Sequence, residues 1–124
     1  MNRLVHEILV LLEAHPLVSR IKIIHLDETP TGKLEVKIRC RIADQQQFQI
    51  WVHQRASTLD YAYQLFTSVP LLRWDNAPHY PAIATAPHHF HDEHNRVSGS
   101  QLTGNPIIDL SLVLAAISEW LEHQ

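Results

Sequence analysis

The chain has 124 residues, of which 45% are hydrophobic and 19% charged, and its formal net charge is −3 with the histidines neutral. This composition predicts one globular domain over residues 1–124, and it excludes a disordered chain and a globally basic nucleic-acid binder. No apolar run approaches the roughly 20 residues of a membrane span, and no secretory signal is recognisable, so we expect a cytoplasmic protein without a membrane partner. The single cysteine, Cys40, excludes an internal disulfide and should be buried and inert.

Helix and strand patterns fill the first 74 residues. Leucine, isoleucine and valine recur at helical spacing over 3–14, and Pro16 would end that helix. Residues 33–42 alternate strictly between apolar and basic or acidic side chains, which predicts a half-buried strand. Similar patterns predict further strands over 18–26, 47–53, 57–66 and 71–74.

Residues 76–104 show no sustained period and contain three prolines, which predicts a long loop. A cap at Asn105 followed by Pro106 then predicts a C-terminal helix. The expected fold class is therefore α+β. It comprises an N-terminal helix, about five mostly antiparallel strands, a long His/Pro-rich loop and a C-terminal helix, with the helices on one face of the sheet.

Histidines gather in the predicted loop. Five of the ten in the chain fall within sixteen residues, and Pro78 and Pro87 each stand directly before one of them. An imidazole serves proton transfer, metal ligation or phosphate binding at neutral pH. The cluster consists of His79, His88, His89, His91 and His94.

Acid–base cleavage of a phosphodiester is the leading interpretation of this cluster. Such cleavage needs a base for the 2′-hydroxyl, an acid for the leaving oxygen and a cation for the phosphate charge. We expect His79, His88 and His89 as acid–base candidates, with Asp75 orienting a histidine. Arg73 and His91 would hold phosphate, and the remaining substrate contacts would come from Asn76, Tyr61 and Tyr63.

Two other interpretations stay open for the same segment. A metal-dependent site would bind a divalent ion such as zinc through His88, His89, His91 and His94 with Asp75 or Asp92, although the spacing matches no strong zinc signature. The alternative function is a non-catalytic module that binds a metal or a partner protein. The leading interpretation needs no cofactor. In the structural interpretation the imidazoles bond backbone groups, and Asp75 and Asn76 are turn residues.

A basic strand face is a weaker candidate. Residues 17–55 contain seven Lys or Arg against four Asp or Glu. Lys37 and Arg39 would bind an RNA backbone, but such a row is more often a solvated sheet face. Trp51 shares this face, where it would stack a base or be covered by a helix.

Three segments together resemble the TumE family of type II toxin–antitoxin toxins. They are YAYQ at 61–64, RWDNAPH at 73–79 and PHHFH at 87–91. The family pattern has a second histidine where this chain has Tyr80, and a lysine where it has Phe90. The resemblance implies a toxin, commonly an endoribonuclease acting on RNA, with a helix-turn-helix antitoxin as its partner. A homodimer is a possible assembly.

Overall fold

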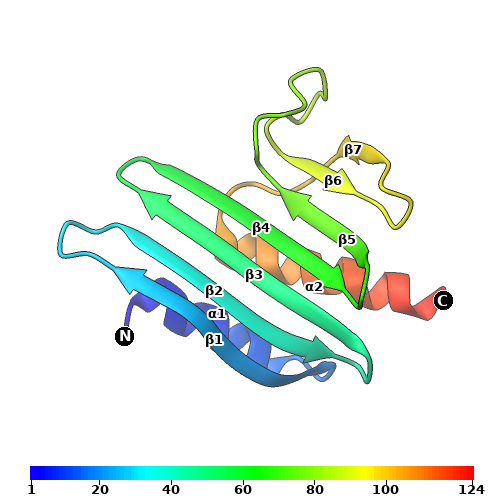
Figure 1. The fold of residues 1–124 in the computed structure, drawn as a ribbon, viewed down its shortest axis with the longest axis horizontal. Coiled ribbons are helices and arrows are strands. Elements are labelled where there is room, and N and C mark those ends of the chain that lie inside the picture. Colours follow the sequence, from blue (N-terminus) through cyan, green and yellow to red (C-terminus); the bar gives the residue numbers. More distant parts are fainter.

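A computed structural model describes residues 1–124, and it shows a curved antiparallel sheet with both helices behind one face (Figure 1). Each of the seven strands pairs with the next one along the chain, so that the spatial order is β1-β2-β3-β4-β5-β6-β7. The α+β class, the antiparallel pairing and the two terminal helices are as expected. The elements are α1 (Arg3–Ala14), β1 (Val18–Glu28), β2 (Leu34–Ile42), β3 (Gln46–Arg55), β4 (Thr58–Phe66), β5 (Pro70–Asp75), β6 (His89–His91), β7 (Val97–Gly99) and α2 (Pro106–Glu122).

The helices begin at asparagine caps. Asn2 accepts hydrogen bonds from the backbone N–H of Leu4 and Val5, and Asn105 does the same for the first turn of α2. These caps satisfy amides that have no partner inside the helix. Neither helix is long and apolar enough to cross a membrane.

The core lies between the helices and one face of the sheet. In β2, alternate residues from Leu34 to Ile42 are buried, and the residues between them are only half-buried. Burying each such side chain stabilises the fold by about 1.5–3 kcal/mol. Cys40 belongs to this core, where burial raises the pKa of its thiol to about 12. The opposite face of the sheet, which we call the open face, carries no helix and looks toward the viewer in Figure 1.

The expectation of about five strands followed by a long loop is wrong for the segment 76–104. This segment contains β6 and β7, which extend the sheet beyond β5. A strand of three residues is too short to produce a period-2 pattern, so only its pairing reveals it. Arg73 pairs with His91 and Asp75 with His89, and part of the histidine cluster therefore belongs to the sheet.

Candidate functional site

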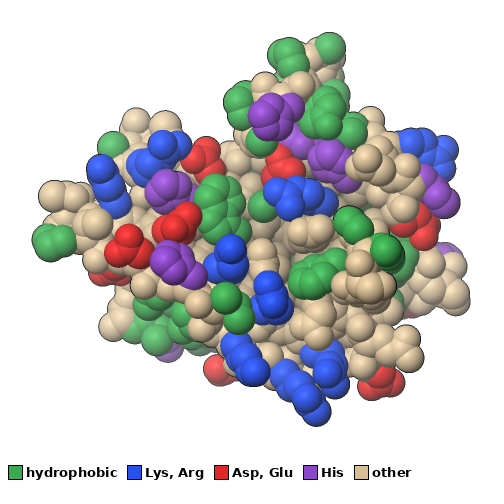
Figure 2. Space-filling view, in the orientation of Figure 1, with side chains coloured by type: hydrophobic (Ala, Val, Ile, Leu, Met, Phe, Trp, Pro, Cys, Tyr) green, Lys and Arg blue, Asp and Glu red, His purple; other side chains and the backbone are tan.

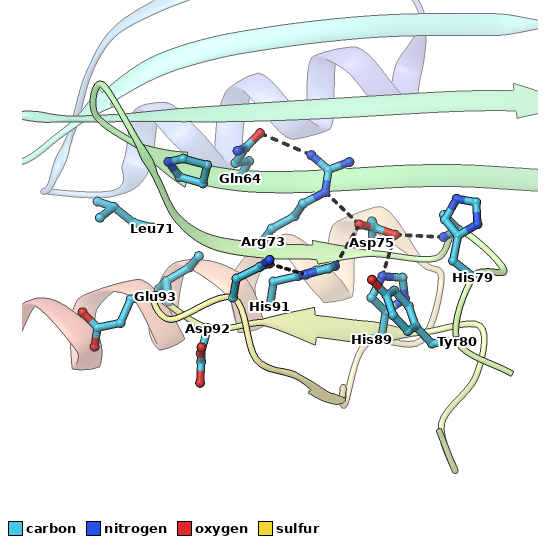
Figure 3. A pocket seen from close by; sticks show the side chains of 14 residues that line it. Gln64, Leu71, Arg73, Asp75, His79, Tyr80, His89, His91, Asp92 and Glu93 are labelled. Atoms are coloured by element: carbon cyan, nitrogen blue, oxygen red, sulfur yellow. Dashed lines mark hydrogen bonds and ion pairs between the residues drawn. The ribbon is translucent and has the colours of Figure 1, made fainter. Parts of the chain in front are cut away.

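Strand register brings four of the expected site residues together on the open face. Arg73 and Asp75 alternate with core residues of β5, while His89 and His91 occupy the matching positions of β6. Paired residues of adjacent antiparallel strands point to the same side. Figure 3 shows the resulting cluster, with Asp75 between the two histidines and the guanidinium of Arg73.

Asp75 is the centre of this cluster. Only 5% of the residue is exposed, and its carboxylate accepts hydrogen bonds from three directions. The backbone N–H of Ala77 lies 2.9 Å from Oδ1, Arg73 Nε lies 2.8 Å from Oδ2, and His89 Nε2 lies 3.0 Å from Oδ1. A buried carboxylate is tolerated because its charge is met by such charge-assisted donors.

His89 is enclosed by acceptors. It is 2% exposed, and its Nδ1 lies 3.0 Å from the carbonyl oxygen of Pro87 while its Nε2 faces Asp75. Neither a carbonyl nor a carboxylate can donate, so both ring nitrogens are satisfied only when both carry a proton. Both ring nitrogens of His89 are therefore engaged within the protein, and neither is free for another ligand.

His91 is more accessible than His89. Its side chain is 18% exposed, and its Nε2 lies 3.9 Å from Asp75 Oδ2. The other ring nitrogen, Nδ1, lies 3.2 Å from Asn95 Oδ1, which orients the ring. The aromatic ring of Tyr80 packs against both histidines, with centroid distances of 4.8 Å to His89 and 5.8 Å to His91.

A cavity of about 530 Å³ opens beside this cluster. His79 and His91 both line it, and Figure 3 shows them on either side of Asp75. Gln64 accepts a hydrogen bond from Nη1 of Arg73 and so holds the guanidinium at the cavity wall. The guanidinium of Arg73 and the N–H groups of the imidazoles gather around a single carboxylate, and such donors suit an anion such as a phosphate group.

The same cluster contains the donors of a metal site. The ligand atoms of Asp75, His89 and His91 all lie within 4.8 Å of one another. Two imidazoles and one carboxylate fit a divalent transition metal. Such an ion would have to displace His89 from Oδ1 of Asp75 and compete with Arg73 for Oδ2 of the same carboxylate. The hydrogen bonds as they stand therefore favour an anion site over a metal site.

His88 and His94 lie outside this cluster. Asp92 Oδ1 accepts from the backbone N–H groups of both His94 and Arg96, and this turn leaves His94 exposed. The bond from Arg96, with the bond from His94, lowers the pKa of Asp92. His88 precedes β6 and lies on the helix side of the sheet, where its Nδ1 is 2.6 Å from the hydroxyl of Tyr61.

Tyr61 and Tyr63 belong to the core rather than to the cavity. Burial raises the pKa of both phenols, and the charge of Asp109 adds to the effect. Both therefore stay protonated at neutral pH, and the hydroxyl of Tyr61 shares a hydrogen bond with Nδ1 of His88. The buried hydroxyl of Tyr63 has no hydrogen-bond partner.

The remaining residues expected to contact substrate, Asn76, Lys37 and Arg39, do not line the cavity. Asn76 accepts from the backbone N–H of Tyr61 and donates to the carbonyl of Leu59, so it ties the end of β5 to β4. Lys37 and Arg39 lie on the open face, several strands away from Asp75. Gln64 and Asn95 line the cavity but were not expected there, because their positions depend on strand register and on a turn that no sequence pattern marks.

Comparison with known protein families assigns the chain to one of them. Residues 8–121 match the model of the family described as Toxin TumE. The chain belongs to the TumE toxin family. This membership supports a toxin function and implies an antitoxin partner. No curated protein and no solved structure matches the chain.

The two residues of this chain that depart from the TumE family pattern, Tyr80 and Phe90, lie in different parts of the structure. Tyr80 lies against the histidines of the cavity. Phe90 faces the other way and packs on Trp74, with ring centroids 4.9 Å apart. The first departure therefore changes the wall of the candidate site, and the second changes the packing on the helix side.

Proposed function

We propose that this toxin is an endoribonuclease whose reaction takes place in the cavity beside Asp75. The observation that carries the proposal is the placement of Arg73 and His91 around a buried Asp75–His89 pair at the wall of that cavity. The proposal includes a type II system with a helix-turn-helix antitoxin, as the resemblance to the family implies.

In the proposed reaction, His91 Nε2 takes the proton of the ribose 2′-hydroxyl. The 2′-oxygen then forms a bond to phosphorus while the bond from phosphorus to the 5′-oxygen breaks. His79, across the cavity, donates a proton to that leaving oxygen. The products are a 2′,3′-cyclic phosphate and a 5′-hydroxyl, and exchange with water restores both histidines. Positioned acid–base groups of this kind accelerate a reaction by roughly 10²–10⁴-fold.

Arg73 and His89 have supporting roles in this proposal. Nε and Nη1 of Arg73 are engaged by Asp75 and Gln64, which leaves Nη2 to bind a phosphate oxygen as negative charge develops. The buried Asp75–His89 pair fixes the guanidinium and His91 in position. His88 lies on the other side of the sheet, so proton transfer is assigned to His79 and His91.

A second candidate function is divalent metal binding, either with or without catalysis. The convergence of Asp75, His89 and His91 favours it. A metal-dependent nuclease would lose cleavage in EDTA. A non-catalytic metal binder would hold stoichiometric metal and turn over no RNA.

The test is an RNA cleavage assay with untagged protein, with and without EDTA. We expect cleavage that survives EDTA, leaves 2′,3′-cyclic phosphate ends, and is lost in Asp75→Asn and His91→Ala. His94→Ala removes an exposed histidine that lies outside the Asp75 cluster and is the matched control, with activity retained. Absence of cleavage by the unchanged protein, or equal cleavage by all variants, would contradict the proposal.

A further inference from the structure

A band of polar side chains crosses the open face and ends at the cavity. Its members are paired in register on six successive strands, so they all point to the same side. Five inter-strand spacings of about 4.8 Å give the band a length of about 24 Å. From β1 to β6 it consists of Lys22, Arg39, Gln49, Gln64, Arg73 and His91.

Three adjoining hollows follow this band. One of about 320 Å³ is lined by the cations Arg20, Lys22, Arg39 and Arg41. Arg39 also lines the next hollow, of about 280 Å³, and Gln64 lines both that hollow and the cavity of the candidate site. We call these hollows together the basic groove. Because neighbouring hollows share a wall, the groove leads from the β1 edge to the reacting groups.

The cations at the β1 and β2 end of the groove have no acidic partner. None of them forms a salt bridge, although Arg39 donates two hydrogen bonds to Gln49. Figure 2 shows basic side chains in a band from the histidine cluster down to the lower edge of this face. Their charge is available to phosphate, and the net negative charge of the chain resides elsewhere. On β1 and β2 the lysines and arginines without a salt bridge are Arg20, Lys22, Lys37, Arg39 and Arg41, of which Lys37 lies outside the three hollows.

Trp51 lies beside the groove, on the same face of β3 as Gln49. No helix covers it, because both helices lie behind the other face. Its indole N–H donates to Glu35 at 3.0 Å, and this bond lowers the pKa of Glu35 and holds the ring in place. On β4 it pairs with the small residue Ala62. A fixed aromatic ring next to unpaired cations is the arrangement that binds unpaired nucleotides.

We infer that the basic groove binds the backbone of a single-stranded RNA, with a base stacked on Trp51, and leads the strand to the cavity. The inference rests on the proposed function and adds the form of the substrate and its path. The length of the band corresponds to about four nucleotides, the lower end of the range for single-strand grooves. Only an unpaired strand offers both a free base face and adjacent phosphates to this surface.

Binding of short oligonucleotides tests the inference. We would measure the fluorescence anisotropy of 5′-fluorescein 2′-O-methyl oligouridylates of 3 and 9 nucleotides, which cannot be cleaved because they lack the 2′-hydroxyl. Lys22→Gln with Arg41→Gln should weaken 9-mer binding by about tenfold and lower its salt slope by about 1.4, while 3-mer binding stays the same. The matched control, Arg3→Gln with Arg55→Gln, removes equal charge elsewhere and should leave both affinities unchanged.

Tryptophan fluorescence gives an independent readout. Titration with the unlabelled 9-mer should quench the emission of the unchanged protein, and the quenching should be lost in Trp51→Phe. Equal 9-mer binding by the Lys22/Arg41 variant and the control would overturn the inference. The inference would also be overturned if the Lys22/Arg41 variant bound RNA normally but no longer bound the antitoxin. The groove would then be a binding site for an acidic segment of that partner.

The two proposals fail separately. If the protein cleaves RNA but the Lys22/Arg41 variant binds the 9-mer as well as the control does, the endoribonuclease proposal stands and the inference about the basic groove is wrong. If length-dependent binding and Trp51 quenching are observed without any cleavage, the groove stands and the endoribonuclease proposal fails.

Discussion

Two aspartates are buried in this protein, Asp75 on the open face of the sheet and Asp109 in the first turn of α2 behind it. Asp109 accepts three hydrogen bonds at 2.8–2.9 Å, all from the backbone and hydroxyl of Thr103 and the backbone of Gly104. These donors are neutral, fixed and adjacent to the helix that Asp109 helps to begin. Asp75 is held largely by side chains that carry charge.

The contrast separates a structural carboxylate from the one for which we propose a role in chemistry. A carboxylate at a helix N-terminus is stabilised by the backbone amides and the helix dipole, and nothing around Asp109 needs to change protonation. Around Asp75, His89 and His91 are titratable, and Arg73 has a free nitrogen at a cavity. Burial alone therefore does not distinguish the two roles, whereas the identity of the donors does.

The largest expected effect is on activity. Asp75→Asn should lower RNA cleavage by at least about 100-fold, because the amide leaves His89 and Arg73 without their counter-charge and misplaces His91. Initial cleavage rates and a circular dichroism spectrum check this. A variant that cleaves normally while folded would place Asp75 in the same structural class as Asp109.

Asp109→Asn should have the opposite profile. Its amide nitrogen would face a backbone donor, so we expect the free energy of unfolding to fall by about 1–3 kcal/mol, with the cleavage rate per folded molecule unchanged. Urea unfolding followed by circular dichroism gives the first quantity, and cleavage at low temperature gives the second. A selective loss of activity would show that the helix side contributes to the reaction.

Tyr80→His introduces the residue of the family pattern against His89 and His91. An additional imidazole should become protonated as the pH falls below about 6.5, so the KM for RNA should fall several-fold at pH 6 and hardly change at pH 8. Tyr80→Phe keeps the ring without the hydroxyl and serves as the control. The same change at both pH values would mean that position 80 acts through shape instead of charge.

Alkaline pH should destabilise the helix side of the protein. Burial favours the neutral phenols of Tyr61 and Tyr63, so the folded state binds more protons than the unfolded chain above the normal tyrosine pKa of about 10. Stability should therefore fall as the pH rises past about 10. In a Tyr80→Phe background, tyrosinate absorbance should appear together with unfolding. Absorbance that rises before unfolding would show that these phenols reach solvent.

The sequence predicts the long elements well because they contain enough residues to show a period. The alternation over 33–42 indicates both the strand and its buried side, and the stripe over 3–14 indicates the first helix. The three-residue strands β6 and β7 have no such signal. They exist because β5 offers an unpaired edge, which is a property of the folded sheet.

The same limit applies to the candidate site. Residue types alone single out Arg73, Asp75 and the histidines. They do not show that His88 and His89 point to opposite sides, since this depends on the residue at which β6 begins. Gln64 is an ordinary polar strand residue until the register places it opposite Arg73. Cross-strand contacts of this kind follow from pairing and not from local composition.

A sheet in which each strand pairs with the next can assemble in the order of its synthesis. When β5 leaves the ribosome it carries Arg73 and Asp75, but the histidines that meet them come from β6, and β7 then completes that edge by residue 99. The cavity cannot exist before this point in translation. The wall of the candidate site is therefore completed only after about four-fifths of the chain has been made, although the strand that carries its central carboxylate comes earlier.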